Sequence, residues 1–379
     1  MRTYEEYSEW LQAHLKQLEV EGVRIFKLST TEREEFKRCR RRWDFASLSR
    51  QGLEPKRPAH ALWFGTGIHL GLEKYYGENL DPSKVFREWG SQEIERLRAA
   101  QGFLWVEEIN AFEETIDLGC KMLENYVAWA QERDPQDFVE VIYTEKEFQV
   151  PVRDLQGNIA RFTDAGGQVW EIHLVGRLDM IVRDSLDRIW LQDHKTSKDK
   201  LDPEILIHND QMVVYLWAAQ EIFQVPFAGA FYNVLRKKLP TVPRVLANGR
   251  GLSQDKNIDT TYEVYYNAIV ENGFDPEDYS EILEHLKSKP NTFFQREKVR
   301  KNQHEIRMAG AMLYLEAVDM LNSPFIYPNK TWDCKWDCDF AKLCLSIDRG
   351  DDTAWMLEHL YQKRTPEEGS VYNRERTDE

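Results

Sequence analysis

Two extended runs separated by only four residues restrict the fold of this chain more than any other feature. Residues 173–183 and 188–194 carry the apolar pattern of strands, and Asp184-Ser185-Leu186-Asp187 forms a polar turn between them. A connection this short between two strands predicts an antiparallel hairpin. The chain is therefore expected to contain a sheet that includes this hairpin.

The segments around the hairpin predict an α/β fold, with helices first, then strands, then a helix and a further strand. Helices are expected at residues 4–18, 31–49, 61–76, 82–100, 107–133, 208–222, 260–287 and 294–321, and further strands at 138–144, 148–152 and 227–234. This order suits a central mixed sheet flanked by helices. Residues 240–259 are expected to form an ordered insertion or loop, and the charged tail after residue 365 is expected to be disordered.

The composition indicates a folded protein whose attraction for polyanions is local. The 379 residues are 42% hydrophobic and contain no apolar run of membrane-spanning length, so we expect a cytoplasmic protein without membrane contact. The net charge of −15 argues against coating nucleic acid by bulk electrostatics, because phosphate neutralisation requires Lys and Arg at the contact. Basic residues instead form three clusters: Arg38, Arg40, Arg41 and Arg42; Arg236, Lys237 and Lys238; and Lys298, Arg300 and Lys301. Such clusters are either solvated surface or part of a local groove.

Charged residues end the second strand of the hairpin. Asp193 and Lys195 lie two apart, so both project from the face that also carries the apolar Ile189 and Leu191. Asp179 in the preceding strand can meet Asp193 across the hairpin. Two carboxylates beside one ammonium suit phosphodiester hydrolysis, in which carboxylates hold Mg²⁺ or Mn²⁺ and a cation steadies the developing charge. The alternative is an ion pair that caps a strand end, since acidic-x-Lys triplets also occur elsewhere in the chain.

Four motifs in order resemble those of a known family. They are Phe64-Gly65-Thr66-Gly67-Ile68-His69, Gly176-Arg177-Leu178-Asp179, Asp193-His194-Lys195 and Gln211-x3-Tyr215. Together they resemble the PD-(D/E)xK nuclease superfamily, in particular its RecB-like and AddB-like branch, which includes the CRISPR-associated iron-sulfur exonucleases and their phage relatives. The resemblance implies a restriction-endonuclease-like mixed sheet flanked by helices.

The resemblance also implies roles for individual residues. His69, Asp179, Asp193 and the backbone carbonyl of His194 would bind one or two Mg²⁺ or Mn²⁺ ions. Lys195 would be catalytic together with the two aspartates. Gln211 and Tyr215, which are i, i+4 neighbours on one helical face, would contact the region of the lysine or the DNA backbone. We expect DNA contacts at Arg41, Arg177, Arg236, Lys237 and Lys238, with strand contacts near Phe231-Tyr232.

Four of the five cysteines suggest a second metal centre. Cys334-x3-Cys338-x5-Cys344 groups three thiols near the C-terminus, and Cys39 stands in an Arg-rich helix near the N-terminus. Thiolates suit an iron-sulfur cluster or Zn²⁺. The one-plus-three distribution resembles the [4Fe-4S] staple of AddB-like nucleases, with Zn²⁺ or unrelated free thiols as the alternatives. Cys120 is expected to be a buried apolar residue.

These observations predict a metal-dependent DNA exonuclease that acts on single-stranded ends in recombination, repair or phage DNA processing, with recombination or replication proteins as partners. A structure-selective endonuclease and a non-catalytic end-binding subunit are the alternatives. We expect an N-terminal helical segment at 1–60, a nuclease core at 61–240, an insertion and helical region at 241–348, and a C-terminal helix and tail at 349–379.

Overall fold

A mixed sheet forms the centre of the protein in the computed structural model, which describes residues 1–56, 60–101, 105–199, 201–247 and 249–364. The tail expected to be disordered therefore lies outside the described residues. The strands of the sheet are β1 (Arg24–Leu28), β3 (Glu140–Pro151), β4 (Arg161–Thr163), β5 (Val169–Arg183), β6 (Ile189–Ser197), β7 (Ala230–Arg236) and β8 (Phe294–Val299).

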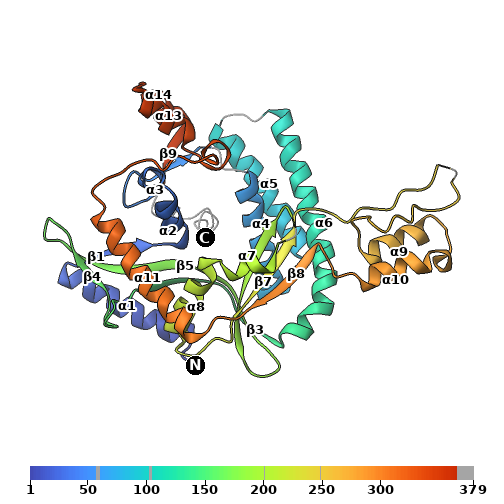
Figure 1. Ribbon diagram of the computed structural model, residues 1–379, viewed down its shortest axis with the longest axis horizontal. Helices are drawn as coiled ribbons and strands as arrows, with labels where there is room; N and C mark the ends of the chain where they lie inside the picture. Colours follow the sequence, from blue (N-terminus) through green and yellow to red (C-terminus); the bar gives the residue numbers. More distant parts are fainter. Residues whose placement is uncertain (57–59, 102–104, 200, 248, 365–379) are drawn as a thin grey trace.

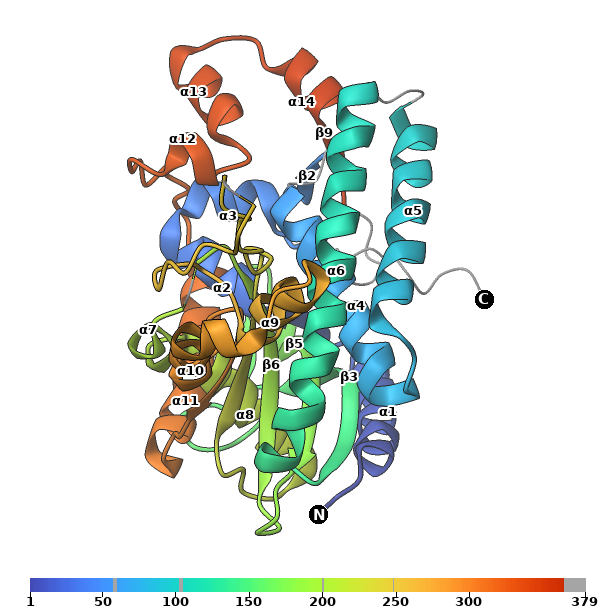
Figure 2. The ribbon, with the colours of Figure 1, turned by 90° about the vertical axis from the view of Figure 1, so that its right-hand side faces the viewer.

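Helices cover both sides of the sheet. Figure 2 shows α8 (Asp210–Phe223) and α11 (Gln303–Asn322) on one side, and α4 (His60–Glu78), α5 (Pro82–Gln101) and α6 (Val106–Asp137) on the other. The predicted α/β class with a helix-flanked mixed sheet is confirmed.

The predicted hairpin is also confirmed. Strands β5 and β6 pair antiparallel from Arg183↔Ile189 to Met180↔Gln192. In the turn, the Asp184 carboxylate accepts hydrogen bonds from the backbone amides of Leu186 and Arg188. Asp187 has a φ of 60°, a left-handed conformation that Asp tolerates better than most residues.

The edge of β5 that faces β6 is divided between two partner strands. Strands β3 and β4 pair with β5 along one edge, whereas on the other edge β1 pairs with residues 170–174 and β6 pairs with residues 180–183. Residues 175–179 therefore have no strand partner on that second edge. The sheet opens at this place, and Asp179 lies where the opening begins.

Glycines allow α4 and α5 to pack closely. A Cβ atom added at Gly67 would lie 2.2 Å from Cζ3 of Trp89 and 2.6 Å from Cε2 of Phe86, both on α5. These rings belong to a second apolar core, which also holds Trp63, Ile68 and Leu123. The Phe64–His69 motif thus fixes the position of α4 through this glycine as well as through its apolar residues.

Three predicted helices differ from the structure, and in one of them residues 260–287 form α9 (Tyr262–Glu271), η1 (Pro276–Tyr279) and α10 (Ser280–Ser288) instead of a single helix. Residues 31–49 form two helices, α2 (Thr30–Arg38) and α3 (Arg40–Ala46), because the backbone is extended at Cys39. Residues 294–299 form strand β8, which pairs antiparallel with β7, before α11 begins at Gln303. A six-residue strand next to a long helix is too short for its periodicity to be separated from the helical pattern. Strand β1 was not expected either.

Between β7 and β8 the chain forms a lobe that projects from the sheet at the right of Figure 1. It contains α9 (Tyr262–Glu271), η1 (Pro276–Tyr279) and α10 (Ser280–Ser288) around a small core of its own. The expected loop before α9 has one short antiparallel bridge, Val245↔Leu252.

The remaining elements surround the two ends of the chain. Helix α1 (Tyr4–Glu21) lies beside β3, and its Tyr7 hydroxyl donates a hydrogen bond to the carbonyl of Gln149. The others are β2 (Leu53–Pro55), α7 (Pro203–Ile207), α12 (Cys334–Asp337), α13 (Ala341–Arg349), α14 (Ala354–Leu360) and β9 (Tyr361–Lys363). Strand β9 pairs with β2, which joins the C-terminal part to the N-terminal part. Within the described ranges, no helix combines the length and apolarity needed to cross a bilayer.

We expect Gly67→Ala to lower the free energy of unfolding by about 1–3 kcal/mol, because the new methyl group would overlap rings in a packed core. Gly65→Ala is the matched control on the same helix, since its Cβ would lie 3.7 Å from Oγ1 of Thr196. Alanine is favoured over glycine in a helix interior by about 1 kcal/mol, so the control should be neutral or stabilising. Urea denaturation measures the difference, and equal stability of the two variants would contradict the close approach of α4 to α5.

Candidate active site

Asp179 and Asp193 face each other where strands β5 and β6 separate. The last pair of the ladder is Met180↔Gln192, so the next position in register brings Asp179 opposite Asp193. The Asp179 carboxylate accepts a hydrogen bond of 2.7 Å from the backbone amide of His194. In a continuous ladder, the amide of His194 would donate to a backbone carbonyl of β5. Here it donates to the Asp179 carboxylate instead. The strand register therefore brings the two aspartates next to each other, whereas the group of donor atoms within 4.8 Å contains Asp179 but not Asp193.

Lys195 is held against Asp193 and helix α8. Its Nζ lies 2.9 Å from Oδ2 of Asp193 and donates a 3.0 Å hydrogen bond to Oε1 of Gln211. Burial alone would lower the pKa of Lys195, but the carboxylates of Asp193 and Asp179 outweigh burial and raise the pKa. The ammonium therefore stays charged at neutral pH. Gln211 therefore contacts Lys195, the residue near which the family resemblance placed it.

The two aspartates titrate differently. Burial raises the pKa of Asp193, although the charge of Lys195 opposes this rise, and the negative charge of Asp179 adds to it. Burial would also raise the pKa of Asp179, but the nearby His69 outweighs it and lowers this pKa well below the ordinary range. Asp179 is thus the carboxylate that stays ionised most readily. A cation placed between the two would favour the ionised form of both.

A third acidic residue, Glu145 of β3, completes the group. His69 Nδ1 lies 3.4 Å from Oδ2 of Asp179 and 3.8 Å from Oε1 of Glu145. One ligand atom from each of these three residues lies within 4.8 Å of the other two. The register of β3 on β5 places Glu145 opposite Asp179, between the pairs Thr144↔Met180 and Lys146↔Leu178.

No motif pointed to Glu145. In the sequence it is one of several charged residues in a strand, and only the pairing of β3 with β5 brings it to Asp179. Its φ of 44° is a left-handed conformation that costs a non-glycine residue about 1–3 kcal/mol. Such strain is retained where the surroundings impose it, which is common at functional sites.

The donor set fits a divalent cation. Among the described residues, Oε1 of Glu145 is buried and accepts no hydrogen bond. Burial also raises the pKa of Glu145, an effect that the His69 side chain partly offsets. Buried carboxylate oxygens without donors cost free energy unless a cation compensates them. Carboxylates with one imidazole suit Mn²⁺ and Mg²⁺, which prefer oxygen donors.

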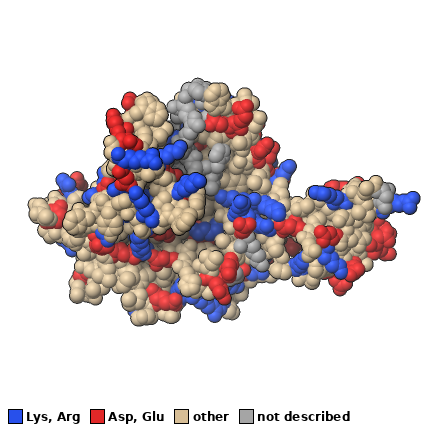
Figure 3. Space-filling model, turned by 45° about the horizontal axis from the view of Figure 1, so that its top comes forward, with Lys and Arg blue, Asp and Glu red and all other residues tan. Residues whose placement is uncertain are grey.

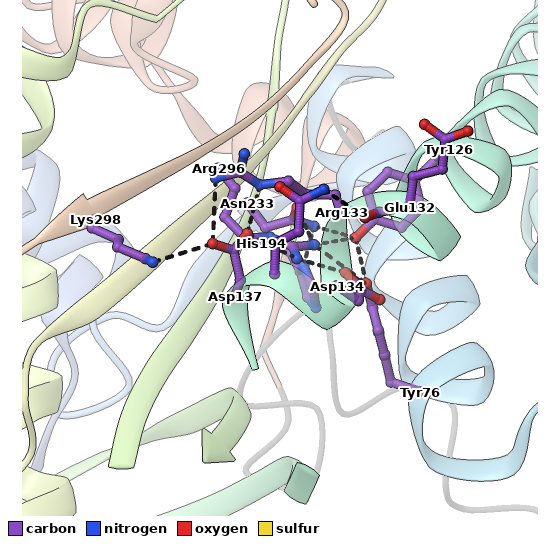
Figure 4. A network of polar contacts seen from close by, with 11 residues as sticks. Tyr76, Tyr126, Glu132, Arg133, Asp134, Asp137, His194, Asn233, Arg296 and Lys298 are labelled. Carbon is purple, nitrogen blue, oxygen red and sulfur yellow. Dashed lines mark hydrogen bonds and ion pairs between the residues drawn. The ribbon is translucent and has the colours of Figure 1, made fainter. Parts of the chain in front are cut away.

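The imidazole of His194 belongs to a separate buried network, shown in Figure 4. Asn233 of β7 donates a 2.8 Å hydrogen bond to Nδ1 of His194 and accepts one of 3.1 Å from Arg296 of β8. Burial lowers the pKa of His194 to about 3, so the ring is neutral. Arg296 in turn pairs with Asp134 of α6 at 2.5 Å. The network joins β6, β7, β8 and α6 directly behind the site, while the backbone of His194 faces Asp179.

Tyr215 packs against the glycine of the second motif. A Cβ atom at Gly176 would lie 2.9 Å from the Tyr215 hydroxyl and 2.8 Å from the Phe148 ring. Phe148 contacts Tyr215 edge-on at a centroid distance of 5.4 Å. Burial raises the pKa of Tyr215, so its hydroxyl stays protonated. Only glycine fits at position 176 without displacing these two rings.

Four of the five basic residues expected to contact DNA, namely Arg41, Arg177, Arg236 and Lys238, are engaged in ion pairs. Arg177 pairs with Glu145 and Glu147, each at 3.2 Å. Arg236 and Lys238 share Asp259, at 3.1 and 2.6 Å. Lys237 is half-buried over the ring of Phe64, and burial lowers its pKa. Figure 3 shows Lys and Arg side chains in and around a hollow in the middle of one face.

One expected DNA contact is corrected. Phe231 and Tyr232 are 0% and 1% exposed, because β7 lies inside the sheet and both of its faces are covered. Their rings therefore cannot stack on bases. A continuous apolar run such as residues 227–234 is typical of a strand that is buried on both faces.

The four cysteines lie where the N-terminal and C-terminal parts of the chain pack together. Cys39 Sγ accepts a hydrogen bond of 3.3 Å from the backbone amide of Asn329, Cys334 Sγ accepts one of 3.4 Å from that of Thr331, and Cys344 Sγ accepts one of 3.4 Å from Arg41. Arg41 also pairs with Asp348. Burial raises the pKa of Cys338, and the nearby Cys334 and Cys39 raise it further.

The Arg-rich segment around Cys39 is part of this junction. Arg38 pairs with Asp333 at 2.6 Å and with Asp337, and Arg42 donates to the carbonyl of Asp337 at 2.6 Å. These contacts bring α2 and α3 to α12. Cys120 is buried, as expected, and its thiol donates to the carbonyl of Ser83.

Comparisons with known proteins agree with this geometry. The family model of the PD-(D/E)XK nuclease superfamily matches residues 27–345, from β1 to the last cysteine of the group. No curated protein matches. One similar solved structure, described as the crystal structure of SSO0001, is 13% identical over 63% of this chain and 80% of that chain, with a TM-score of 0.25, and is too distant to bear on fold or function. Because the family model spans most of the chain, this protein belongs to the PD-(D/E)XK nuclease superfamily.

Proposed function

We propose that this protein is a DNA exonuclease of the RecB-like and AddB-like branch that hydrolyses phosphodiester bonds at single-stranded ends. Its superfamily makes it a metal-dependent nuclease. The observation that carries the proposed chemistry is the meeting of Asp179, Asp193 and Lys195 where the sheet opens. Asp179 and Asp193 are the acidic pair of the nuclease signature, and Lys195 is its lysine.

His69, Glu145, Asp179 and Asp193 would hold Mg²⁺ or Mn²⁺, together with the backbone carbonyl of His194. The bound ion would polarise the scissile phosphate and lower the pKa of a water molecule. The protein itself contributes the fixed arrangement of donors. The amide of His194 holds Asp179, and the network behind β6 holds His194. A rigid site of this kind needs little rearrangement when substrate binds.

Lys195 would supply positive charge beside the phosphate and orient the attacking water. Two contacts, to Asp193 and Gln211, limit where its ammonium can lie. Tyr215 supports this arrangement from the same helical face as Gln211 by packing on Gly176.

DNA would approach through the hollow on the face shown in Figure 3. Arg41, Arg177, Arg236, Lys237 and Lys238 are the proposed contacts, and several of them would exchange carboxylate partners for phosphates. Such exchange weakens with salt, so binding should depend strongly on ionic strength. The resemblance to stand-alone exonucleases supports single-stranded ends as substrate and a place in recombination, repair or phage DNA processing. A structure-selective endonuclease is the alternative within the same chemistry.

The four cysteines Cys39, Cys334, Cys338 and Cys344 would bind a [4Fe-4S] cluster. Amide and guanidinium groups donate to three of the sulfurs, as suits thiolate ligands. Zinc, which thiolates also bind, is the second candidate.

We expect Asp193→Asn and Lys195→Met each to reduce cleavage of linear single-stranded DNA by about 100-fold or more. The estimate corresponds to several kcal/mol of lost charge stabilisation, at 1.36 kcal/mol for each tenfold change in rate. Asp187→Asn is the matched control, because Asp187 lies in the exposed turn of the same hairpin. Rates are measured with 5′- and 3′-labelled oligonucleotides and Mg²⁺ or Mn²⁺. Undiminished cleavage by both variants would refute the mechanism. Cleavage of circular single-stranded DNA by the unchanged protein would show that it is an endonuclease and not an exonuclease.

Glu145→Gln should raise the Mn²⁺ concentration needed for half-maximal cleavage at least severalfold, because one anionic oxygen is lost from the metal site. Glu147→Gln is the control, since Glu147 lies on the same strand and also pairs with Arg177 but is far more exposed. Titration of Mn²⁺ binding by electron paramagnetic resonance, without DNA, separates metal affinity from catalysis. An equal Mn²⁺ requirement in the two variants would remove Glu145 from the site.

Cys344→Ser should lose most of its iron and its absorption in the visible blue, and its chain ends should become more sensitive to protease, because the cluster would join them. Cys120→Ser, which changes a cysteine outside the group, should keep its iron. Metal analysis and limited proteolysis of anaerobically purified protein measure both effects. Stoichiometric zinc without iron in the unchanged protein would contradict the cluster.

A further inference from the structure

A second group of metal-binding side chains lies away from the nuclease site. His14 of α1, Glu171 of β5 and His173 of β5 each offer one donor atom within 4.8 Å of the other two. The Nε2 atoms of His14 and His173 lie 2.5 and 2.9 Å from the same Glu171 oxygen, Oε1. Two imidazoles thus converge on one carboxylate oxygen. The side chains of Glu171 and His173 are 0% exposed and that of His14 is 12% exposed.

Regular secondary structure produces this convergence. Glu171 and His173 are two residues apart on β5, so their side chains leave the same face of the strand. Helix α1 lies beside β3, the strand that pairs with β5, and directs His14 at Glu171. His173 is six residues from Asp179 along the strand, or about 20 Å at ~3.3 Å per residue. The group is therefore separate from the nuclease site.

Neighbouring side chains orient the imidazole rings of His14 and His173. The Gln149 side-chain amide lies 2.8 Å from Nδ1 of His173, and the ring of His14 stacks on Trp10 with a centroid distance of 5.3 Å and an interplanar angle of 5°. A metal-binding imidazole donates its far N–H to a partner, and the Gln149 amide accepts this hydrogen bond from Nδ1 when its side-chain oxygen takes the place of its nitrogen. Nε2 of each ring is thereby directed at the shared oxygen.

The charges around the group accommodate a cation. Glu171 Oε2 is 3.1 Å from Arg161, which also pairs with Glu21 at 3.0 Å. These pairs neutralise Arg161 and leave Oε1 to the two histidines. Two imidazoles and one carboxylate are a frequent zinc ligand set, with a water molecule in the fourth position.

We propose that His14, Glu171 and His173 bind a Zn²⁺ ion that fastens α1 to the sheet. The ion has a structural role, since it lies far from the scissile phosphate expected at Asp179. The alternative is a hydrogen-bonded His-Glu-His group without metal. The zinc site and the metal-free group respond differently to Glu171→Gln. Glutamine keeps an acceptor oxygen for one imidazole but removes the charge that a metal ion requires.

The test measures zinc bound by the full-length protein, using Zn²⁺ alone as the probe. Unchanged protein, His14→Gln, Glu171→Gln and the control His304→Gln are dialysed to equilibrium with Zn²⁺, and metal per chain is counted by mass spectrometry. His304 is an exposed histidine of α11. We expect His14→Gln and Glu171→Gln to bind one ion fewer per chain than the control. Because the difference between variants is counted, zinc at the nuclease or cysteine sites does not affect the result.

Two further measurements distinguish loss of the metal site from misfolding of a variant. Zn²⁺ should raise the melting temperature of the unchanged protein and of His304→Gln, but not that of His14→Gln, whose partly exposed side chain leaves the fold least disturbed. In protein loaded with Co²⁺, His14→Gln should also lose a tetrahedral absorption band that the control retains. Equal zinc content in His14→Gln and His304→Gln, with no difference in melting shift, would overturn the proposal in favour of the metal-free group.

Discussion

Like charges buried side by side are the constraint on which the site depends. Asp179 and Asp193 face each other at the point where β5 loses its partner strand, with Glu145 opposite Asp179 on the other edge. Such a group is costly in a protein interior unless cations compensate it. Lys195 and His69 supply part of that compensation. The proposed divalent ion would supply the rest of the compensation, so the charges that destabilise the fold would also bind the metal.

The opening in the sheet explains why these residues meet at all. A continuous pairing of β5 and β6 would use the amide of His194 in the ladder, whereas the divided edge leaves it to Asp179. The strands remain in place because the buried network of Arg296, Asn233 and His194 ties β6, β7 and β8 to α6 (Figure 4). Hydrogen bonds between buried side chains favour one arrangement of the strands, although Nε of Arg296 has no hydrogen-bond partner among the described residues. The buried network thus holds the strands that carry the donors of the site.

The ends of the chain are joined by more than one kind of contact. Strand β9 pairs with β2, and Arg38 and Arg42, on either side of Cys39, pair with aspartates near Cys334. These exposed ion pairs contribute little stability individually. Together they hold the segment around Cys39 against the segment around Cys334, and the proposed cluster would close a loop of nearly the whole chain. At the opposite side of the sheet, the proposed zinc site would fasten α1 in a similar way.

The local sequence pattern predicted a large part of this structure. The short turn predicted the hairpin of β5 and β6, strand alternation placed Asp193 and Lys195 on one face, and helical spacing paired Gln211 with Tyr215. Each of these depends on neighbours within a few residues. Tertiary structure alone decided the rest. Glu145 joined the site through a strand register, Cys39 lay at a break between helices, and Phe231 was buried by a sheet that covers it on both faces. These outcomes depend on contacts between segments far apart in the sequence, and no local periodicity encodes them.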